Sequence, residues 1–259
     1  MDTDNLIRRA DANYFHCRSV FATAALRGDV AQWGGILLTS IGVKMAPFNT
    51  AFVTQPLTDP VTEVRGVVSF FGDRGLPFSI RIREDVDPAA EDACEELGLV
   101  LEQSEPGMVL PEISSDIPSP PPGLEVRRVS LEEGYDDFVV TMSVASGMPV
   151  ESGYHLISPE LFDALWVEHY TGYVDGQAVA TSTLVASHRV AGVYNISTLE
   201  GHRRKGYGTA LSWHAIARGT ELRANIASLQ ATEMGAPLYE RMGFRKLSTC
   251  NDYVQPVDS

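Results

Sequence analysis

The sequence has few cysteines, few basic residues and no long apolar run. Its 259 residues include only Cys17, Cys94 and Cys250, which are scattered and odd in number. They form neither a disulfide framework nor the paired spacing of a zinc site, so we expect no metal and a reducing, cytoplasmic location. No apolar stretch is long enough to cross a bilayer. The acidic start at residues 1–4 has the wrong charge for a secretory signal.

Basic residues are outnumbered by acidic ones, 20 to 34, which gives a formal net charge of -14. This surplus disfavours nucleic acid and anionic membranes as partners. It is compatible with a cationic amine as a ligand, although many proteins are acidic without any such role. The length and the 44% hydrophobic content allow one large domain or two of ordinary size.

Helical and strand-like patterns alternate along the chain, which predicts an α/β or α+β fold with a mixed central sheet flanked by helices. Asp-Pro pairs at residues 59–60 and 87–88 are typical of helix starts, and Asp175-Gly176 is typical of a tight hairpin. Helices are expected over residues 5–26, 60–71, 88–97, 138–144, from 159 through 166, 210–217 and 236–242. Strands are expected over residues 36–41, 50–54, 78–83, 99–101, 108–110, 124–129, 169–174, 178–186, 190–198, 225–230 and from 244 onward.

A basic turn containing two glycines stands between an expected strand and a helix. Residues 203–210 read Arg-Arg-Lys-Gly-Tyr-Gly-Thr-Ala. Unpaired N–H groups at a helix N-terminus bind phosphate, and glycine lets a phosphate approach the backbone closely. The turn is not a Walker A loop, and Leu211 stands where a dinucleotide-binding fingerprint would have its third glycine. On these residues alone, an anion site and a solvated basic loop both remain open.

Two motifs together resemble the GCN5-related N-acetyltransferases (GNATs). The pattern Arg203-x-x-Gly206-x-Gly208 is similar to this family's Arg/Gln-x-x-Gly-x-Gly/Ala signature, and residues 238–244, Leu-Tyr-Glu-Arg-Met-Gly-Phe, are similar to its second hallmark. The resemblance covers roughly residues 124–254. It implies a GNAT fold, acetyl-CoA as co-substrate, and a primary amine on a small molecule or peptide as acceptor. A homodimer is compatible with it.

The resemblance also implies roles for individual residues. Tyr239 corresponds to the general acid that protonates the departing thiolate, a role that a phenol can fill. The pantetheine arm is peptide-like and can pair with strand backbone, which requires the two central strands to separate after Thr198. Thr232 stands where the family often has an asparagine that contacts the pantetheine. The expected acetyl-CoA-binding residues are Ile196, Ser197, Thr198, Arg203, Arg204, Lys205, Gly206, Tyr207, Gly208, Thr209, Ala210 and Thr232.

The general base is left open by the sequence. Asn195 lies on the strand where the family often carries a glutamate, and an amide cannot take a proton. The alternatives are a chain of water molecules and the titratable residues Glu168, Glu200, Glu233, His155 and His169.

A Pro/Ser-rich segment divides the sequence into two halves. We expect a linker over residues 111–123, because its prolines continue neither a helix nor a central strand. Residues 95–99, Glu-Glu-Leu-Gly-Leu, parallel residues 240–244 of the GNAT-like half, 124–259. Cys94 stands where the second half has Tyr239, and the first half has no glycine-rich basic turn. Residues 1–110 are therefore interpreted as a degenerate GNAT-like domain.

These observations favour an N-acetyltransferase. An acetyl-CoA-binding sensor or interaction protein without turnover is the alternative, which the departure at Asn195 favours. A longer acyl-CoA donor is a third possibility. The acceptor itself cannot be named from the sequence, because variable helices build its cleft.

Overall fold

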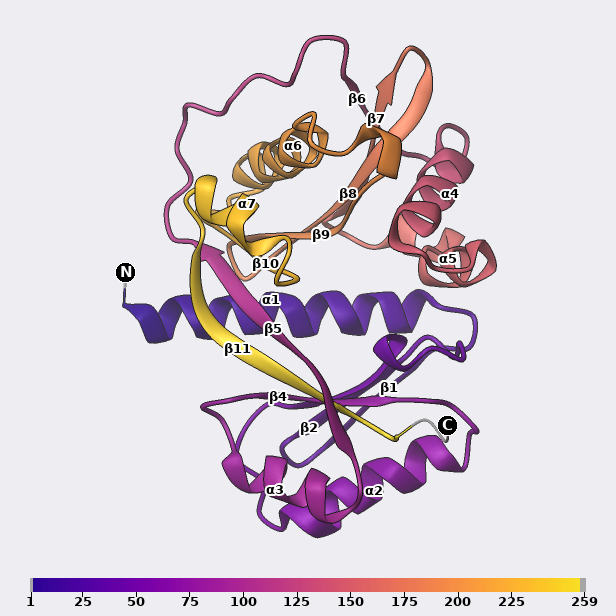
Figure 1. Ribbon diagram of the computed structural model, residues 1–259, viewed down its shortest axis with the longest axis vertical. Helices are drawn as coiled ribbons and strands as arrows, with labels where there is room; N and C mark the ends of the chain where they lie inside the picture. Colours follow the sequence, from indigo (N-terminus) through magenta and orange to yellow (C-terminus); the bar gives the residue numbers. More distant parts are fainter. Residues whose placement is uncertain (1, 257–259) are drawn as a thin grey trace.

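The computed structural model describes residues 2–256 and arranges them around one mixed sheet of eleven strands (Figure 1). The strands are β1 (Asp29–Trp33), β2 (Ile36–Ser40), β3 (Asn49–Val53), β4 (Ser79–Arg83), β5 (Val100–Leu110), β6 (Glu125–Arg128), β7 (Val167–Val174), β8 (Gln177–Ser187), β9 (Val190–Thr198), β10 (Ile226–Gln230) and β11 (Arg245–Val254). The helices are α1 (Thr3–Ala24), α2 (Pro60–Gly72), α3 (Pro88–Glu96), α4 (Tyr135–Ser146), α5 (Val150–Leu156), α6 (Tyr207–Glu221) and α7 (Ala236–Arg241). Three short 3-10 helices are η1 (Ala46–Phe48), η2 (Pro159–Asp163) and η3 (Glu200–His202).

Two long strands join the halves of the sheet. The order is β1-β2-β3-β4-β11-β5-β10-β9-β8-β7-β6, so β11 of the C-terminal half pairs with β4, and β5 of the N-terminal half pairs with β10. β5 and β11 also pair with each other along most of their length. Each half therefore completes its part of the sheet with a strand from the other.

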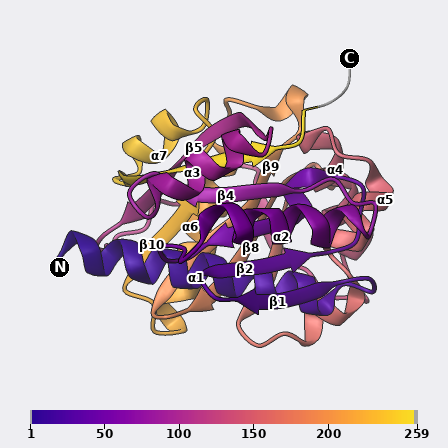
Figure 2. The same cartoon turned by 90° about the horizontal axis from the view of Figure 1, so that it is seen from below.

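Helices cover the sheet differently in the two halves. α2 and α3 pack on the N-terminal strands, where Val64, Val67 and Phe71 of α2 are buried against Ile36 and Ile80 (Figure 2). α6 packs on β8 and β9. α1 runs between the two halves and contacts β2, β5, β9 and β10 (Figure 1). Its position makes it a wall shared by both halves.

The helices α3 and α7, which carry the short sequence repeat, end with the same backbone geometry. Gly98 and Gly243 follow these helices with φ of 79° and 93°. The N–H of Leu99 donates to the carbonyl of Cys94 at 2.9 Å, and the N–H of Phe244 donates to Tyr239 at 3.0 Å. Both glycines adopt the left-handed conformation that closes a helix without steric cost, so the two halves end this helix in the same way.

Several local expectations are wrong. Residues 100, 101 and 108–110 belong to one strand, β5, which runs through Pro106 and Gly107 and begins one residue after Leu99. The expected helix beyond Ser158 is only the 3-10 segment η2, and Leu165 and Trp166 lie outside it, exposed. The helix α5 and the strand β1 were not expected. The expected 111–123 linker has no helix or strand, and the division of the chain into domains stays a prediction.

Candidate functional site

The central strands β9 and β10 separate early. Their parallel pairing runs from Val190↔Ile226 to Gly192↔Ser228, while β9 continues to Thr198. The expectation that the strands part after Thr198 is therefore wrong by six residues. Beyond Gly192 the edge of β9 that faces β10 is open, and an unpaired strand edge can accept a peptide-like chain. Ile196, Ser197 and Thr198 lie on this open stretch.

A bulge shapes the open stretch of β9. The register with β8 shifts between the pairs Thr183↔Tyr194 and Thr181↔Ser197, and Asn195 has a φ of 50°. The Thr181 hydroxyl donates to the Asn195 carbonyl at 2.9 Å, and the Asn195 side-chain amide donates to Thr183 Oγ1 at 3.1 Å. These two bonds hold a non-glycine residue in a conformation that would otherwise be costly. Asn195 therefore stabilises the bulge at the position where the family often has a glutamate.

The N-terminus of α6 has no side-chain cap. Gly206 precedes the helix with a φ of 82°, and no side chain accepts from the first turn. A Cβ on Gly208 would lie 3.4 Å from Thr198 Oγ1 and 3.8 Å from Ile196 Cγ2, so this turn adjoins the end of β9. The uncapped N–H groups and the positive end of the helix dipole can attract an anion beside the open strand.

The structure narrows the set of N–H groups that can serve such a site. The Ala210 N–H donates to the Gly206 carbonyl at 2.9 Å, so Ala210 is not a free donor, contrary to expectation. Only the first turn of the helix, Tyr207 to Thr209, lacks intrahelical acceptors.

Of the three basic residues in the turn, Arg203 has a defined structural role. Its guanidinium donates to the carbonyls of Thr198 and Ala145, both at 3.2 Å, and thereby ties the turn to β9 and α4. Arg204 has a φ of 62° and, like Lys205, is exposed. Arg204 and Lys205 therefore remain available to an anion at the rim.

A cavity of about 520 Å³ opens where β9 and β10 part. It brings together Ile196, Thr232 and Tyr239 of the expected site, whereas the glycine turn lies outside it. The remaining lining residues are Tyr14, Cys17, Arg18, Phe21, Phe48, Glu105, Ser146, Leu156, Val193, Tyr194, Asn195, Gln230, Ala231 and Gly235. Its size suits a small molecule or a short segment of chain.

Tyr239 lies in the wall of this cavity. Its side chain is 7% exposed and meets the Phe244 ring edge-on, with centroids 5.8 Å apart. Burial raises the pKa of Tyr239 to about 12, although a hydrogen bond with Ser212 lowers it. The phenol therefore stays protonated at neutral pH, which is the state that a proton donor requires. Thr232, nearby, uses its hydroxyl to accept from the Gly235 N–H at 3.1 Å and so stabilises the turn that leads into α7.

None of the expected base candidates lines the cavity. Burial lowers the pKa of His169 to about 3, so this imidazole is neutral, and its ring packs against Phe138 and Phe162. Glu168 is paired with Arg218 at 3.0 Å. The carboxylate that does line the cavity is Glu105, whose Oε2 accepts from Arg81 at 2.6 Å.

The N-terminal half contributes residues that the sequence did not reveal. Tyr14, Cys17, Arg18 and Phe21 follow the spacing i, i+3, i+4 and i+7 on α1, which is the pattern of any helix with one buried face. Glu105 comes from β5. Only the position of α1 between the halves makes these residues part of the cavity, and no local pattern could have indicated it.

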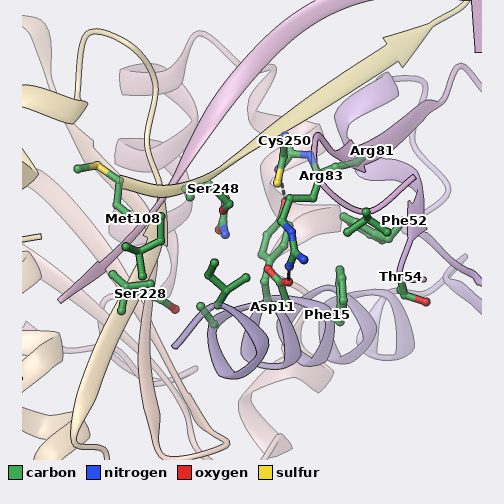
Figure 3. A pocket seen from close by; sticks show the side chains of 18 of the residues that line it. Asp11, Phe15, Phe52, Thr54, Arg81, Arg83, Met108, Ser228, Ser248 and Cys250 are labelled. Carbon is green, nitrogen blue, oxygen red and sulfur yellow. Dashed lines mark hydrogen bonds and ion pairs between the residues drawn. The ribbon is translucent and has the colours of Figure 1, made fainter. Parts of the chain in front are cut away.

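The N-terminal half is closed in the sense that its strands do not separate. β3 and β4 stay paired to Val53↔Ile82, at their ends, and beside these ends lie a cavity of about 30 Å³ and a more open one of about 560 Å³. Both cavities are lined by Asp11 of α1 and Arg83 of β4, which form an ion pair (Figure 3). Burial raises the pKa of Asp11 to about 6, although Arg83 opposes this. The smaller of the two cavities has room for about one water molecule.

The opened central strands, the uncapped helix and the mixed sheet together form the acyl-CoA N-acyltransferase fold. Residues 165–246 match the family model described as Acetyltransferase (GNAT) domain, so this part of the chain is a GNAT domain. No curated protein matches the chain in sequence.

Solved structures share the fold over nearly the whole chain. A GCN5-related N-acetyltransferase from Kribbella flavida superposes with a TM-score of 0.74 at 18% identity, covering 96% of both chains. A GCN5-related N-acetyltransferase from Sphaerobacter thermophilus gives 0.61 at 13% identity, covering 87% of this chain and 79% of that one. A tandem GNAT protein from the clavulanic acid biosynthesis pathway gives 0.59 at 13% identity, covering 96% of this chain and 95% of the other. The expected fold is thereby confirmed, and a degenerate N-terminal copy agrees with the tandem relative.

Two further properties concern residues 2–256. No helix there is long and apolar enough to span a membrane. No cluster of three or more histidine, cysteine or acidic side chains in this range could hold a metal ion.

Proposed function

We propose that the C-terminal half transfers an acetyl group from acetyl-CoA to a primary amine. One observation carries this proposal: the open edge of β9 and Tyr239 line one cavity, and the uncapped N-terminus of α6 adjoins the end of β9 beside it. These features fit an elongated ligand whose anionic end lies at the N-terminus of α6, whose peptide-like arm follows the open edge of β9, and whose reactive end lies beside Tyr239. Acetyl-CoA would supply the acetyl group as an activated thioester.

Each part of the chain has a distinct task in this reaction. The first turn of α6 holds the pyrophosphate through the N–H groups of Tyr207, Gly208 and Thr209. The open edge of β9 aligns the arm, and a backbone N–H beside the bulge stabilises negative charge on the carbonyl oxygen. Tyr239 donates a proton to the departing thiolate while the amine nitrogen forms its bond to the acetyl carbon.

A coenzyme-binding protein without turnover is the second candidate. It is favoured by Asn195 and by the pairing of Glu105 with Arg81, which together leave the cavity without a free carboxylate among its described residues. In the transferase, water molecules in the cavity would instead carry the proton from the incoming ammonium group.

Coenzyme A release with a panel of primary amines, followed by mass analysis of the products, separates the two candidates. The transferase gives equal amounts of free thiol and acetylated amine, and Tyr239→Phe slows both together. If calorimetry shows acetyl-CoA binding but no amine in the panel causes release of the coenzyme A thiol, only the second candidate is left.

A further inference from the structure

A single cation from the N-terminal half faces the cavity where the acceptor must bind. Arg18 of α1 lines both the 520 Å³ cavity and a neighbouring one of about 190 Å³. Tyr14, Phe48 and Glu105 line both cavities as well, so the two adjoin. Arg18 is thus placed between the reaction centre and a second space that a longer acceptor could enter.

Arg18 is anchored on one side and keeps unused hydrogen-bond donors on the other, and its Cζ lies 5.7 Å from the centre of the Phe52 ring. Its Nη2 donates to the Pro47 carbonyl at 2.6 Å and to Thr50 Oγ1 at 3.2 Å. Within residues 2–256, Nε and Nη1 donate to no other group, and no carboxylate forms an ion pair with this guanidinium. The Nε–H and the two Nη1–H groups of this half-buried guanidinium therefore remain as donors, and charged N–H groups of this kind form strong hydrogen bonds with a carboxylate.

The nearby acidic residue does not fill this role. Glu105 is already bound by Arg81, which also pairs with Asp252. Glu102, Glu105 and Asp252 line the adjoining cavity, so a doubly charged anion would meet repulsion there. A carboxylate, with a single charge, fits this surrounding better than a phosphate group does.

We propose that the acceptor is a primary amine that also carries a carboxylate, which Arg18 binds while the amine reaches the thioester beside Tyr239. The inference rests on the proposed function and names its substrate class: an amino acid or an ω-amino acid. The apolar walls formed by Phe21, Phe48 and Tyr194 would pack against the carbon chain between the two charged groups. In this view the N-terminal half supplies the specificity for the acceptor.

Matched pairs of amines test the inference. Glycine, β-alanine, 4-aminobutyrate and 6-aminohexanoate are each compared with the primary amide of the same compound, which keeps the amine and removes the charge. The wild type should prefer at least one acid over its amide by about 10- to 100-fold in kcat/KM, the size expected for a charged hydrogen-bonded partner. Arg18→Met should remove this preference, Arg18→Lys should restore part of it, and KM for acetyl-CoA should stay constant.

A binding measurement keeps the inference separate from the proposed function. The same pairs are titrated by calorimetry into protein saturated with coenzyme A, where no transfer can occur. Tighter binding of an acid that depends on Arg18 supports the inference even without turnover, and failure of transfer would then count against the function alone. The exposed Arg8, also on α1, is the matched control, and Arg8→Met should leave the preference unchanged.

Two results would overturn the inference. The first is equal use and equal binding of every acid and its amide by the wild type. The second is an Arg18→Met variant with lower thermal stability but an intact preference, which would mean that Arg18 only balances Glu105 and Asp252.

Discussion

The two halves of this chain share a layout but differ in every feature that coenzyme binding needs. In the C-terminal half β9 and β10 part after Gly192, whereas β3 and β4 stay paired to their ends. The helix after β9 starts at an uncapped glycine, but α2 starts at Asp59, whose carboxylate accepts from the Thr62 N–H at 3.2 Å. The two halves therefore differ in strand separation and in the capping of the helix that follows the central strand, which are the features that the proposed site depends on.

In the closed half, the residues at the equivalent places form stabilising contacts within the protein. Glu63 accepts from the N–H groups of Thr58 and Asp59, so the start of α2 is satisfied by its own carboxylates. Asp11 and Arg83 occupy the space beyond β3 and β4. The N-terminal half also contributes residues of α1 and β5 to the cavity of the C-terminal half.

The largest effect is expected at the junction that holds the halves together. Arg81 of β4 donates to Asp252 of β11, to Glu105 of β5 and to the Tyr14 hydroxyl of α1. Arg81→Met would leave Asp252, which is 3% exposed, without its charge partner. Removing one member of a buried pair costs about 3–5 kcal/mol, and we expect a loss of this size in the unfolding free energy measured with denaturant.

A second substitution separates the effect of the isolated charge from the effect of lost packing. Asp252→Asn in the Arg81→Met background removes the isolated charge and should recover part of the lost stability. A single variant as stable as the wild type would show that the junction is held by strand pairing alone.

The next effect concerns the equivalent helix positions Tyr239 and Cys94. Tyr239→Phe should lower turnover by about 100-fold or more with little change in acetyl-CoA affinity, because the proton donor is lost and the ring remains. Cys94→Ala, at the same position of the closed half, should leave turnover unchanged. Normal turnover of Tyr239→Phe would mean that solvent, and not Tyr239, protonates the departing thiolate.

A smaller effect is expected at the phosphate turn. Gly206→Glu places a side chain at a φ of 82° and a negative charge beside the uncapped helix. We expect acetyl-CoA affinity to fall by more than about tenfold, or about 1.4 kcal/mol, in calorimetry. Wild-type titrations should give one acetyl-CoA per chain. Two equivalent sites, or unchanged affinity in a folded variant, would contradict the difference between the halves.

Local chemistry explains what could be predicted from the sequence. Asp59-Pro60 and Asp87-Pro88 do cap α2 and α3, and Asp175-Gly176 does turn the β7–β8 hairpin with φ of 50° and 77°. Each of these signals depends only on neighbours in sequence. The glycine turn of α6 was found in the same way.

Long-range pairing explains what could not be predicted. Pro106 and Gly107 look like a break, yet β5 continues through them because it lies between β10 and β11 and is paired on both sides. The crossing of β5 and β11 between the halves depends on residues more than a hundred positions apart. For the same reason, Arg18 and Glu105 could not be placed in the candidate site before the fold was known.

The smallest effect is expected at Asp59, the residue that caps α2 in the closed half. Its carboxylate caps α2, and the hydrogen bond from Thr62 lowers the pKa of Asp59. An acid with a lowered pKa in the folded state stabilises the protein above its unfolded pKa, and this contribution is lost as the pH falls through the folded value. Asp59→Ala should therefore lower the Tm slightly at pH 7, and the difference from the wild type should vanish at low pH, near and below the lowered pKa of Asp59. The variant should still bind one acetyl-CoA per chain, because β3 and β4 stay paired and leave no open strand edge for the arm. Appearance of a second site in Asp59→Ala would mean that the cap alone, and not strand separation, distinguishes the two halves.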